Sequence, residues 1–346
     1  MNKDLKKYLQ YILFGVFLMI LPIMQQNDIL ISNSNITVIG TVLFYSIVGI
    51  GLNVLLGYSG LVSLGTAGFM GFGAYLTGYF SATLELNFFL SVFLAMLVPS
   101  VLGAIVGLIS LRLEGYYLAI ATLGFAEVLK VVFVELEWFT GGFSGLQTSY
   151  PSIFDNFDFF GSQTSKILTY DLIVVVLVIL LIVTYNFIHS ATGRALLTMK
   201  GSQAAAQAMG INLFKYKLIA FIVSTVYAAL GGALYMAFIR SAYPATWTLN
   251  LSLQILAVVV IGGVRTITGP IFGAFVVFGI PELVFKNIPL LAGIDGLSYI
   301  FTGILIIVVI LFYPNGLIYL GHDVKNWYNK LFKKGDKNQK EEIANE

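Results

Sequence analysis

The chain has 346 residues, of which 58% are hydrophobic and only 10% are charged, and its formal net charge is +2. A soluble domain carries roughly 25% charged residues. This chain therefore has too few charges to cover a water-exposed surface, and lipid must cover much of its exterior. The chain contains no cysteine, which excludes disulfides, thiol catalysis and thiolate metal sites.

Ten apolar stretches follow one another along the chain. They are 8–24, 36–57, 61–82, 88–111, 115–137, 168–188, 214–239, 251–264, 267–285 and 297–313. A helix needs roughly 20 residues to cross a bilayer, and a helix satisfies its own backbone hydrogen bonds in lipid. We therefore predict an all-α polytopic membrane protein with about ten transmembrane helices. The eighth stretch is short, so a broken or re-entrant helix and a full crossing both remain open.

The basic residues indicate how the chain is oriented. If both termini are cytoplasmic, 15 of the 19 Lys and Arg residues lie on the inner side, against Lys166, Arg240 and Lys286 outside and Lys130 within a span. Such a bias is typical of bacterial inner-membrane proteins. We expect a multi-pass protein of the bacterial cytoplasmic membrane, with a permease domain over 1–320 and a polar cytoplasmic tail over 321–346. The first span has no small-residue cleavage pattern, so we do not interpret it as a signal peptide.

The segment 189–213 is the only long internal stretch with a cytoplasmic character, and we name it the coupling segment. Its pattern predicts a short helix, a break at Gly201 and a second helix, because Ser202 is a good N-cap and Gly210 a natural stop. The alanines between these two residues would leave a smooth face that the groove of another protein could accept. The alternative is a plain amphipathic loop helix at the membrane. The chain has no phosphate-binding loop motif, so we expect no ATP hydrolysis by the chain itself.

The segment 57–74 is the densest in glycine. Glycine allows helices to approach closely, and it also allows backbone to unwind beside a cavity. In the second case Ser59, Ser63 and Thr66 could face a substrate. The density of glycine does not decide between the two interpretations.

Glu127 and Lys130 lie within the fifth predicted span, three residues apart and therefore on one helical face. An ionisable group in a membrane indicates a functional site by default, although a structural pair in the bundle interior would explain both residues equally well. His189 and His322 are isolated and give no metal-ligand spacing. The longest outer loop, 135–165, is acidic and is either a solvated loop or a docking surface for an outside partner.

A further set of motifs extends in order over nearly the whole chain. It comprises Gly57-Tyr58-Ser59-Gly60-Leu61-Val62-Ser63-Leu64-Gly65, Gly71-Phe72-Gly73-Ala74-Tyr75, Tyr117-Leu118-Ala119-Ile120-Ala121-Thr122-Leu123-Gly124-Phe125, Gly193-Arg194-Ala195-Leu196, Ala208-Met209-Gly210-Ile211-Asn212, Gly231-Gly232-Ala233-Leu234-Tyr235, Ile261-Gly262-Gly263 and Leu311-Phe312-Tyr313-Pro314. Each motif alone is weak. Together, in this order, they resemble the permeases of the branched-chain amino acid ABC importers, the LivM type.

This resemblance implies a fold like that of the vitamin B12 importer permease and a set of partners. Those partners are a second homologous permease, two cytoplasmic subunits that bind ATP and Mg, and an external substrate-binding protein; no cofactor is expected in this chain, and no nucleic acid. Coupling to the ATPases is expected at Arg194, Ser202, Gln203, Ala205, Ala206, Gln207, Ala208 and Gly210. The substrate path is expected to be lined or shaped by Ser63, Thr66, Thr122 and Glu127. The function implied is inward translocation of Leu, Ile and Val by alternating access.

The chain departs from the family pattern at several positions. Gly201, Gln203 and Gln207 stand where acidic residues are frequent, which indicates a less charged contact with the ATPase. Thr66 replaces a frequent His and Gln254 a usual Glu, so urea or short amides remain alternative cargoes. Two other classes also remain open: a proton-coupled secondary transporter that uses Glu127, and a passive channel.

Overall fold

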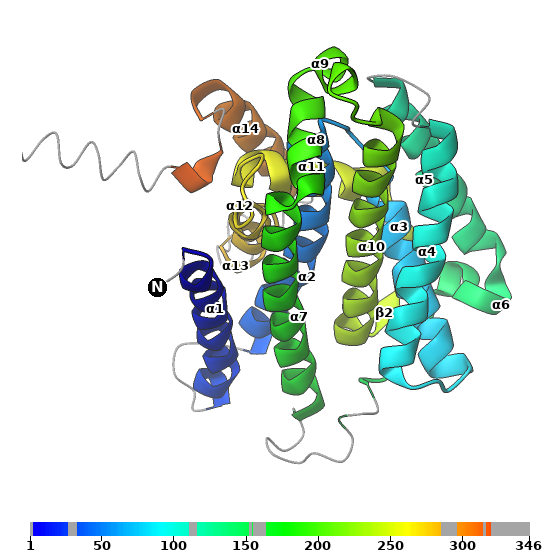
Figure 1. Ribbon diagram of the computed structural model, residues 1–346. Helices are drawn as coiled ribbons and strands as arrows, with labels where there is room; N and C mark the ends of the chain where they lie inside the picture. Colours follow the sequence, from blue (N-terminus) through cyan, green and yellow to red (C-terminus); the bar gives the residue numbers. More distant parts are fainter. Residues whose placement is uncertain are drawn as a thin grey trace, which may run out of the picture.

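The computed structural model describes residues 3–26, 33–110, 116–151, 154, 164–284, 296–313 and 316–319. Within these ranges the chain is mainly helical (Figure 1). The α-helices are α1 (Lys3–Gln26), α2 (Asn33–Asn53), α3 (Thr66–Gly78), α4 (Phe88–Ser110), α5 (Tyr116–Glu135), α6 (Glu137–Thr140), α7 (Thr164–His189), α8 (Ala191–Gly201), α9 (Gln203–Ala208), α10 (Leu213–Ile239), α11 (Leu249–Gly262), α12 (Gly269–Ala274), α13 (Ile280–Leu283) and α14 (Leu297–Phe312). A small antiparallel pair, β1 (Leu146–Gln147) and β2 (Ser241–Ala242), joins two loops.

Three helices continue into π-helical turns. They are η1 (Val54–Ser59) after α2, η2 (Tyr79–Thr83) after α3, and η7 (Phe275–Gly279) between α12 and α13. π-Helical turns inside longer helices are frequent at functional sites. After η1 the backbone runs without regular structure to the start of α3 at Thr66, so the glycine-rich segment does leave the helical path.

In the described part of the chain, six helices are long and apolar enough to cross a membrane. They lie at Asp4–Met24, Asn35–Ser59, Phe88–Leu108, Tyr117–Glu135, Thr164–His189 and Leu213–Ile239. Shorter apolar helices occupy Leu249–Gly262, Gly269–Leu283 and Ile300–Phe312. These helices confirm the prediction of an all-α polytopic membrane protein.

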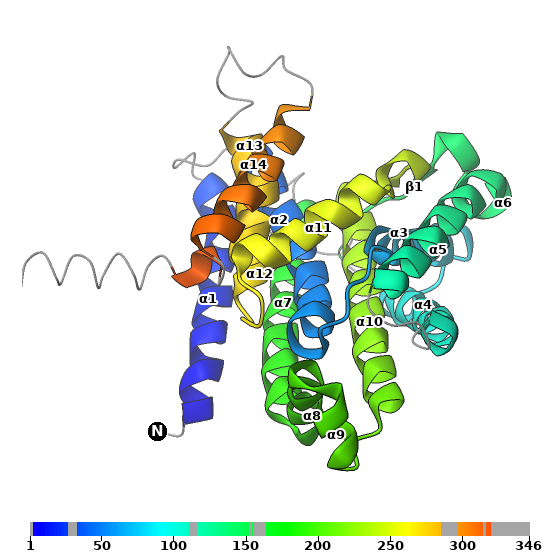
Figure 2. The same cartoon turned by 90° about the horizontal axis from the view of Figure 1, so that it is seen from above.

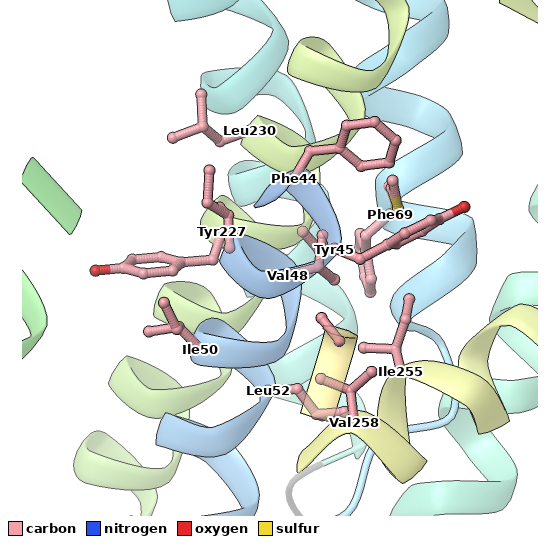
Figure 3. Packing of buried hydrophobic residues seen from close by; sticks show 14 of the residues in the cluster. Phe44, Tyr45, Val48, Ile50, Leu52, Phe69, Tyr227, Leu230, Ile255 and Val258 are labelled. Atoms are coloured by element: carbon pink, nitrogen blue, oxygen red, sulfur yellow. The ribbon is translucent and has the colours of Figure 1, made fainter. Parts of the chain in front are cut away.

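The second span is the centre of the molecule. It is 83% buried over its most apolar window, whereas the spans Asp4–Met24 and Phe88–Leu108 are only 22% buried. Residues of α2 such as Phe44, Val48 and Leu52 pack against α10, α11 and their neighbours (Figure 3). α11 runs across the other helices beside α2 and α12 (Figure 2). Helices α1 and α4 instead present long apolar side chains outward, as expected of a lipid-facing surface.

Glycine brings α3 and α10 into the closest helix contact that we describe. A Cβ atom added at Gly73 would overlap the Ala229 carbonyl, and one added at Gly232 would overlap the Met70 carbonyl oxygen. The close-packing interpretation of the glycine-rich segment is therefore correct for Gly73, and it coexists with the unwound backbone before Thr66. Because each contact is made with backbone, neither can be relieved by turning a side chain.

Some sequence predictions lie outside the described residues. They concern Lys286, His322, part of the acidic loop 135–165 and the tail over 321–346.

Candidate functional site: the coupling segment

The coupling segment folds as a helix, a break and a second helix, which confirms the sequence prediction. Ser202 is extended, with φ −158° and ψ 116°, and its hydroxyl accepts a hydrogen bond of 3.2 Å from the amide of Ala205. At the other end Gly210 adopts a left-handed conformation with φ 77°. The amide of Ile211 then donates to the carbonyl of Ala206 at 3.0 Å. This pattern is a Schellman motif, which satisfies the last carbonyls of α9 and fixes its end.

Short helix α9 lies at one end of the molecule, beyond the ends of α7 and α10 (Figures 1 and 2). Most of the predicted coupling residues are exposed: Arg194, Ser202, Gln203, Ala205, Gln207, Ala208 and Gly210. Ala206 differs, because it is fully buried against the rest of the protein. Met209 adds an apolar side chain that is 64% exposed. The surface of α9 is thus small, smooth and partly apolar, as a docking surface for another protein requires.

Two lysines connect this segment to the helices of the membrane domain. The Lys200 ammonium donates to the Gly57 carbonyl at 2.7 Å, at the end of η1. Lys217, which is buried, donates to the Gln203 side chain at 3.2 Å and so joins the start of α10 to α9. Burial, and then the nearby Arg265 guanidinium, lower the pKa of Lys200. Hydrogen bonds therefore join α8 to η1, which continues α2, and α9 to α10.

The same end of α2 is bound to the loop between α11 and α12. The buried Asn53 amide donates to the Thr266 carbonyl at 2.6 Å and accepts from the Arg265 amide at 3.0 Å. The Tyr58 hydroxyl donates to the Arg265 carbonyl at 2.8 Å. Arg265 needs this support, because its φ of 69° is unusual for a residue other than glycine. These bonds extend the link from the coupling segment to a third part of the bundle.

The predicted path residues do not converge on one cavity. Ser63 and Thr66 are buried and line a cavity of only about 10 Å³ against α10. The Thr122 hydroxyl accepts from the Leu64 amide at 3.0 Å and donates to the Ala119 carbonyl at 3.0 Å. Thr122 thus holds the irregular backbone before α3 in place, which is a structural role.

Glu127 lies apart from these residues, on the outer face of α5. It forms an ion pair of 3.9 Å with Lys130, as the spacing predicted, and the two side chains remain 49% and 37% exposed, respectively. The alternative of a pair in the interior of this subunit is therefore wrong. A charged pair on an exposed face of a membrane helix is costly against lipid. This face of α5 is accordingly a candidate for contact with a water-filled path or with a second subunit.

Sequence reasoning missed three polar residues within or next to the spans. Asn53 and Lys217 make the buried links described above. Asp171 lies near the start of α7, and its carboxylate oxygen Oδ1 is buried without a hydrogen-bond partner among the described residues. A polar side chain inside a predicted span was the available signal for all three. No three His, Asp or Glu side chains in the described ranges come together in a way that could hold a metal ion.

Comparison with known proteins identifies the family. A family model described as "Branched-chain amino acid transport system / permease component" matches residues 34–310. The chain belongs to this permease family. It is 30% identical over 308 residues to the high-affinity branched-chain amino acid transport system permease protein LivM of Salmonella typhimurium, over 84% of this chain and 71% of the relative. It is 29% identical to the LivM protein of Escherichia coli, over 88% of this chain and 74% of that protein.

The family also connects this chain to sugar permeases. A ribose import permease protein RbsC of Haemophilus influenzae is 28% identical over 56% of this chain and 59% of its own length. No solved structure gives a significant match. Proteins of this permease family are transport subunits of ABC transporters, in which partner subunits hydrolyse ATP.

Proposed function

We propose that this chain is one of two permease subunits of an ABC importer, and that α9 is the surface through which an ATPase subunit acts on it. The exposed alanine helix carries the proposal. It is capped at both ends, it projects beyond the bundle, and Lys200 and Lys217 connect it to the two most buried spans. A loop helix at the membrane surface would need none of these connections.

The mechanism is alternating access. ATP binding and hydrolysis by the partners displace α9, and the displacement reaches α2 through Lys200 and α10 through Lys217. The hydrogen bonds of Asn53 carry it further to the α11–α12 loop. A rigid connection of this kind is what a two-state rocking motion requires, because the energy supplied at one surface must bias a whole bundle.

We further propose that the ten apolar stretches of the sequence all correspond to membrane spans, in an arrangement like that of the vitamin B12 importer permease. Ten spans put both termini in the cytoplasm of a bacterial cell, which the distribution of Lys and Arg favours. With 14 residues, α11 rises about 21 Å, less than the roughly 30 Å of the hydrocarbon core. It therefore reaches across the membrane only with the residues that flank it. The permease domain then covers 1–320 and the cytoplasmic tail 321–346.

Branched-chain amino acids are the proposed cargo, delivered by an external binding protein that supplies the affinity. The LivM relatives named above support this choice more than the ribose permeases do, because they match more of the chain. Urea or short amides remain the second candidate, since Thr66 and Gln254 depart from the family pattern within the spans. The exposed face of α5 with Glu127 is the part of this subunit that we propose to face the path or the second permease.

The decisive test introduces a bulky charge on the docking surface. Ala205→Arg should abolish ATP-dependent leucine uptake and co-purification of the ATPase subunits, while expression and membrane insertion stay normal. Ala191→Arg is the matched control, because Ala191 is also exposed and begins α8 at its far end from α9. Normal uptake by Ala205→Arg would refute the coupling role.

Two measurements separate the remaining alternatives. Purification in mild detergent should recover an ATP-binding subunit and a second permease, and their absence would favour a secondary transporter or a channel. Competition of labelled leucine uptake by valine, urea and acetamide identifies the cargo. Because the chain has no cysteine, a single Ser202→Cys variant reports orientation: it should react with an impermeant thiol reagent only after the cells are opened.

A further inference from the structure

A large cleft runs between α1, α2, α7, α8 and α12, with a volume of about 1170 Å³. Helices α1 and α12 lie on the same side of α7 in both views (Figures 1 and 2). At the end near the coupling segment the cleft is lined by Lys7, Arg194 and Arg265. Farther along it is walled by apolar side chains, which include Phe14, Leu18, Val42, Leu43, Ile271 and Phe272. The cleft thus has a cationic mouth and an apolar interior.

Among the described residues, no carboxylate forms an ion pair with Lys7, Arg194 or Arg265. The ion pair described above, between Lys130 and Glu127, involves no residue of the cleft. None of the described residues that line the cleft is acidic. Asp4, three residues before Lys7, does not line the cleft but accepts a hydrogen bond of 2.8 Å from Tyr185, which does. Arg194 donates one bond, to the His189 carbonyl at 2.8 Å, which leaves most of its donors available.

The size and lining of the cleft favour a long, largely apolar ligand over a small polar one. Its volume of about 1170 Å³ exceeds the roughly 300–1,000 Å³ of most small-molecule pockets. The three cations at the mouth match an anionic head group, whereas no described carboxylate lines the cleft to pair with the ammonium group of an amino acid. From Lys7 to Leu21, which both line the cleft, α1 rises about 21 Å. One leaflet of the hydrocarbon core is roughly 15 Å deep, so the apolar part can accommodate an acyl chain.

The cleft is also accessible from the bilayer. Phe272 and Phe275 of the α12 region line it and remain 56% and 45% exposed. The cationic mouth lies at the end of the molecule that the proposed orientation assigns to the cytoplasm. We infer that this cleft binds one anionic phospholipid of the cytoplasmic leaflet, with the phosphate at Lys7, Arg194 and Arg265 and an acyl chain along α1 and α12. Basic pockets between membrane helices on the cytoplasmic side bind such headgroups in other proteins.

The test measures lipid retained by the full-length chain with its co-purifying partners. The protein is placed in nanodiscs of phosphatidylcholine, with or without phosphatidylglycerol, then extracted into mild detergent and weighed by native mass spectrometry. We expect one phosphatidylglycerol per permease and no comparable retention of phosphatidylcholine. The Lys7→Gln/Arg265→Gln variant should retain roughly 25-fold less, since each basic residue contributes about fivefold. Ile271→Trp, which fills the apolar part, should also lower retention.

Two control variants distinguish a site from general charge effects and from misfolding. Lys215→Gln removes an exposed cation that does not line the cleft and should retain lipid like the wild type. Lys7→Arg/Arg265→Lys keeps both charges and should restore binding. Equal losses in Lys215→Gln and the double variant would overturn the proposal.

Competing occupants give distinct results, all of which would overturn the proposal. Oleate retained as well as phosphatidylglycerol would make the ligand a free fatty acid, and displacement by inorganic phosphate alone would make it a simple anion. Lipid bound only after removal of residues 321–346, or only by the permease separated from its partners, would mean that protein fills the cleft. These measurements need neither ATP nor cargo, so failure here leaves the importer function untouched.

Discussion

The contact between α3 and α10 gives the sharpest stability prediction. Replacing Gly232 by alanine would place a methyl group on the Met70 carbonyl oxygen. The added methyl carbon would lie 1.8 Å from that oxygen. Ordinary contact lies near 3.5 Å, so the two helices would have to separate by roughly 1.7 Å at this point. Overpacking of a well-packed interior costs typically about 1–3 kcal/mol. The added methyl group would meet backbone, which cannot rotate away. We therefore expect a loss of unfolding free energy at the upper end of this range, about 3 kcal/mol.

The assay is thermal unfolding in detergent, followed by size-exclusion fluorescence, with leucine uptake measured in parallel. For a chain of 346 residues, a loss of about 3 kcal/mol corresponds to an apparent melting temperature lower by roughly 4 °C. Gly124→Ala is the matched control, because Gly124 is also helical and within a span but has no atom near its added Cβ. Alanine should be neutral there or stabilising by up to about 1 kcal/mol. Equal melting temperatures for the two variants would refute the close approach of α3 and α10.

Three further predictions concern the coupling segment and α5. Lys200→Gln should leave the ATPase subunits bound but lower uptake per ATP hydrolysed, because the bond to the Gly57 carbonyl is lost; unchanged stoichiometry would contradict the link. Gly210→Ala should destabilise the end of α9 by about 1–2 kcal/mol, because its φ of 77° is left-handed, and faster proteolysis of the segment should reveal this. Glu127→Gln should lower the rate of uptake without abolishing it; complete loss that follows the external pH would instead favour a proton-coupled transporter.

Much of the fold was predictable because it depends on local sequence. Apolar stretches longer than about 17 residues have few alternatives to a helix in a membrane, and the ends of α9 follow from Ser202 and Gly210 alone. The π-helical turns were not predicted, since they replace α-helix without changing composition. The short β1–β2 pair was also missed, because its two strands lie far apart in the sequence and each has only two residues.

Only part of the site was predictable from the sequence, because the rest depends on contacts between residues that are far apart in the chain. Exposure along α9 depends on tertiary packing, so no local pattern distinguishes buried Ala206 from exposed Ala205. The partners of Lys200 and Lys217 depend on long-range contacts in the same way. Ser63 and Thr122 were predicted to contact the substrate, but their hydroxyls accept hydrogen bonds from backbone amides. A hydroxyl within a span indicates a polar partner, and the sequence does not show whether that partner is a substrate or the protein's own backbone.

The distribution of burial indicates which part of the molecule moves as a unit. Helices α2, α3 and α10 pack closely at glycines and are largely buried. The hydrogen bonds of Lys200 and Lys217 connect α8 and α9 to this group, at η1 and α10 respectively. Helix α1 packs mainly along α7 and is 22% buried, so it can shift without breaking that core. A push on α9 is therefore transmitted to the central helices before it reaches the periphery. The transport motion that we propose is a rotation of this core relative to α1, α14 and the second permease, with the cleft beside α1 at the boundary.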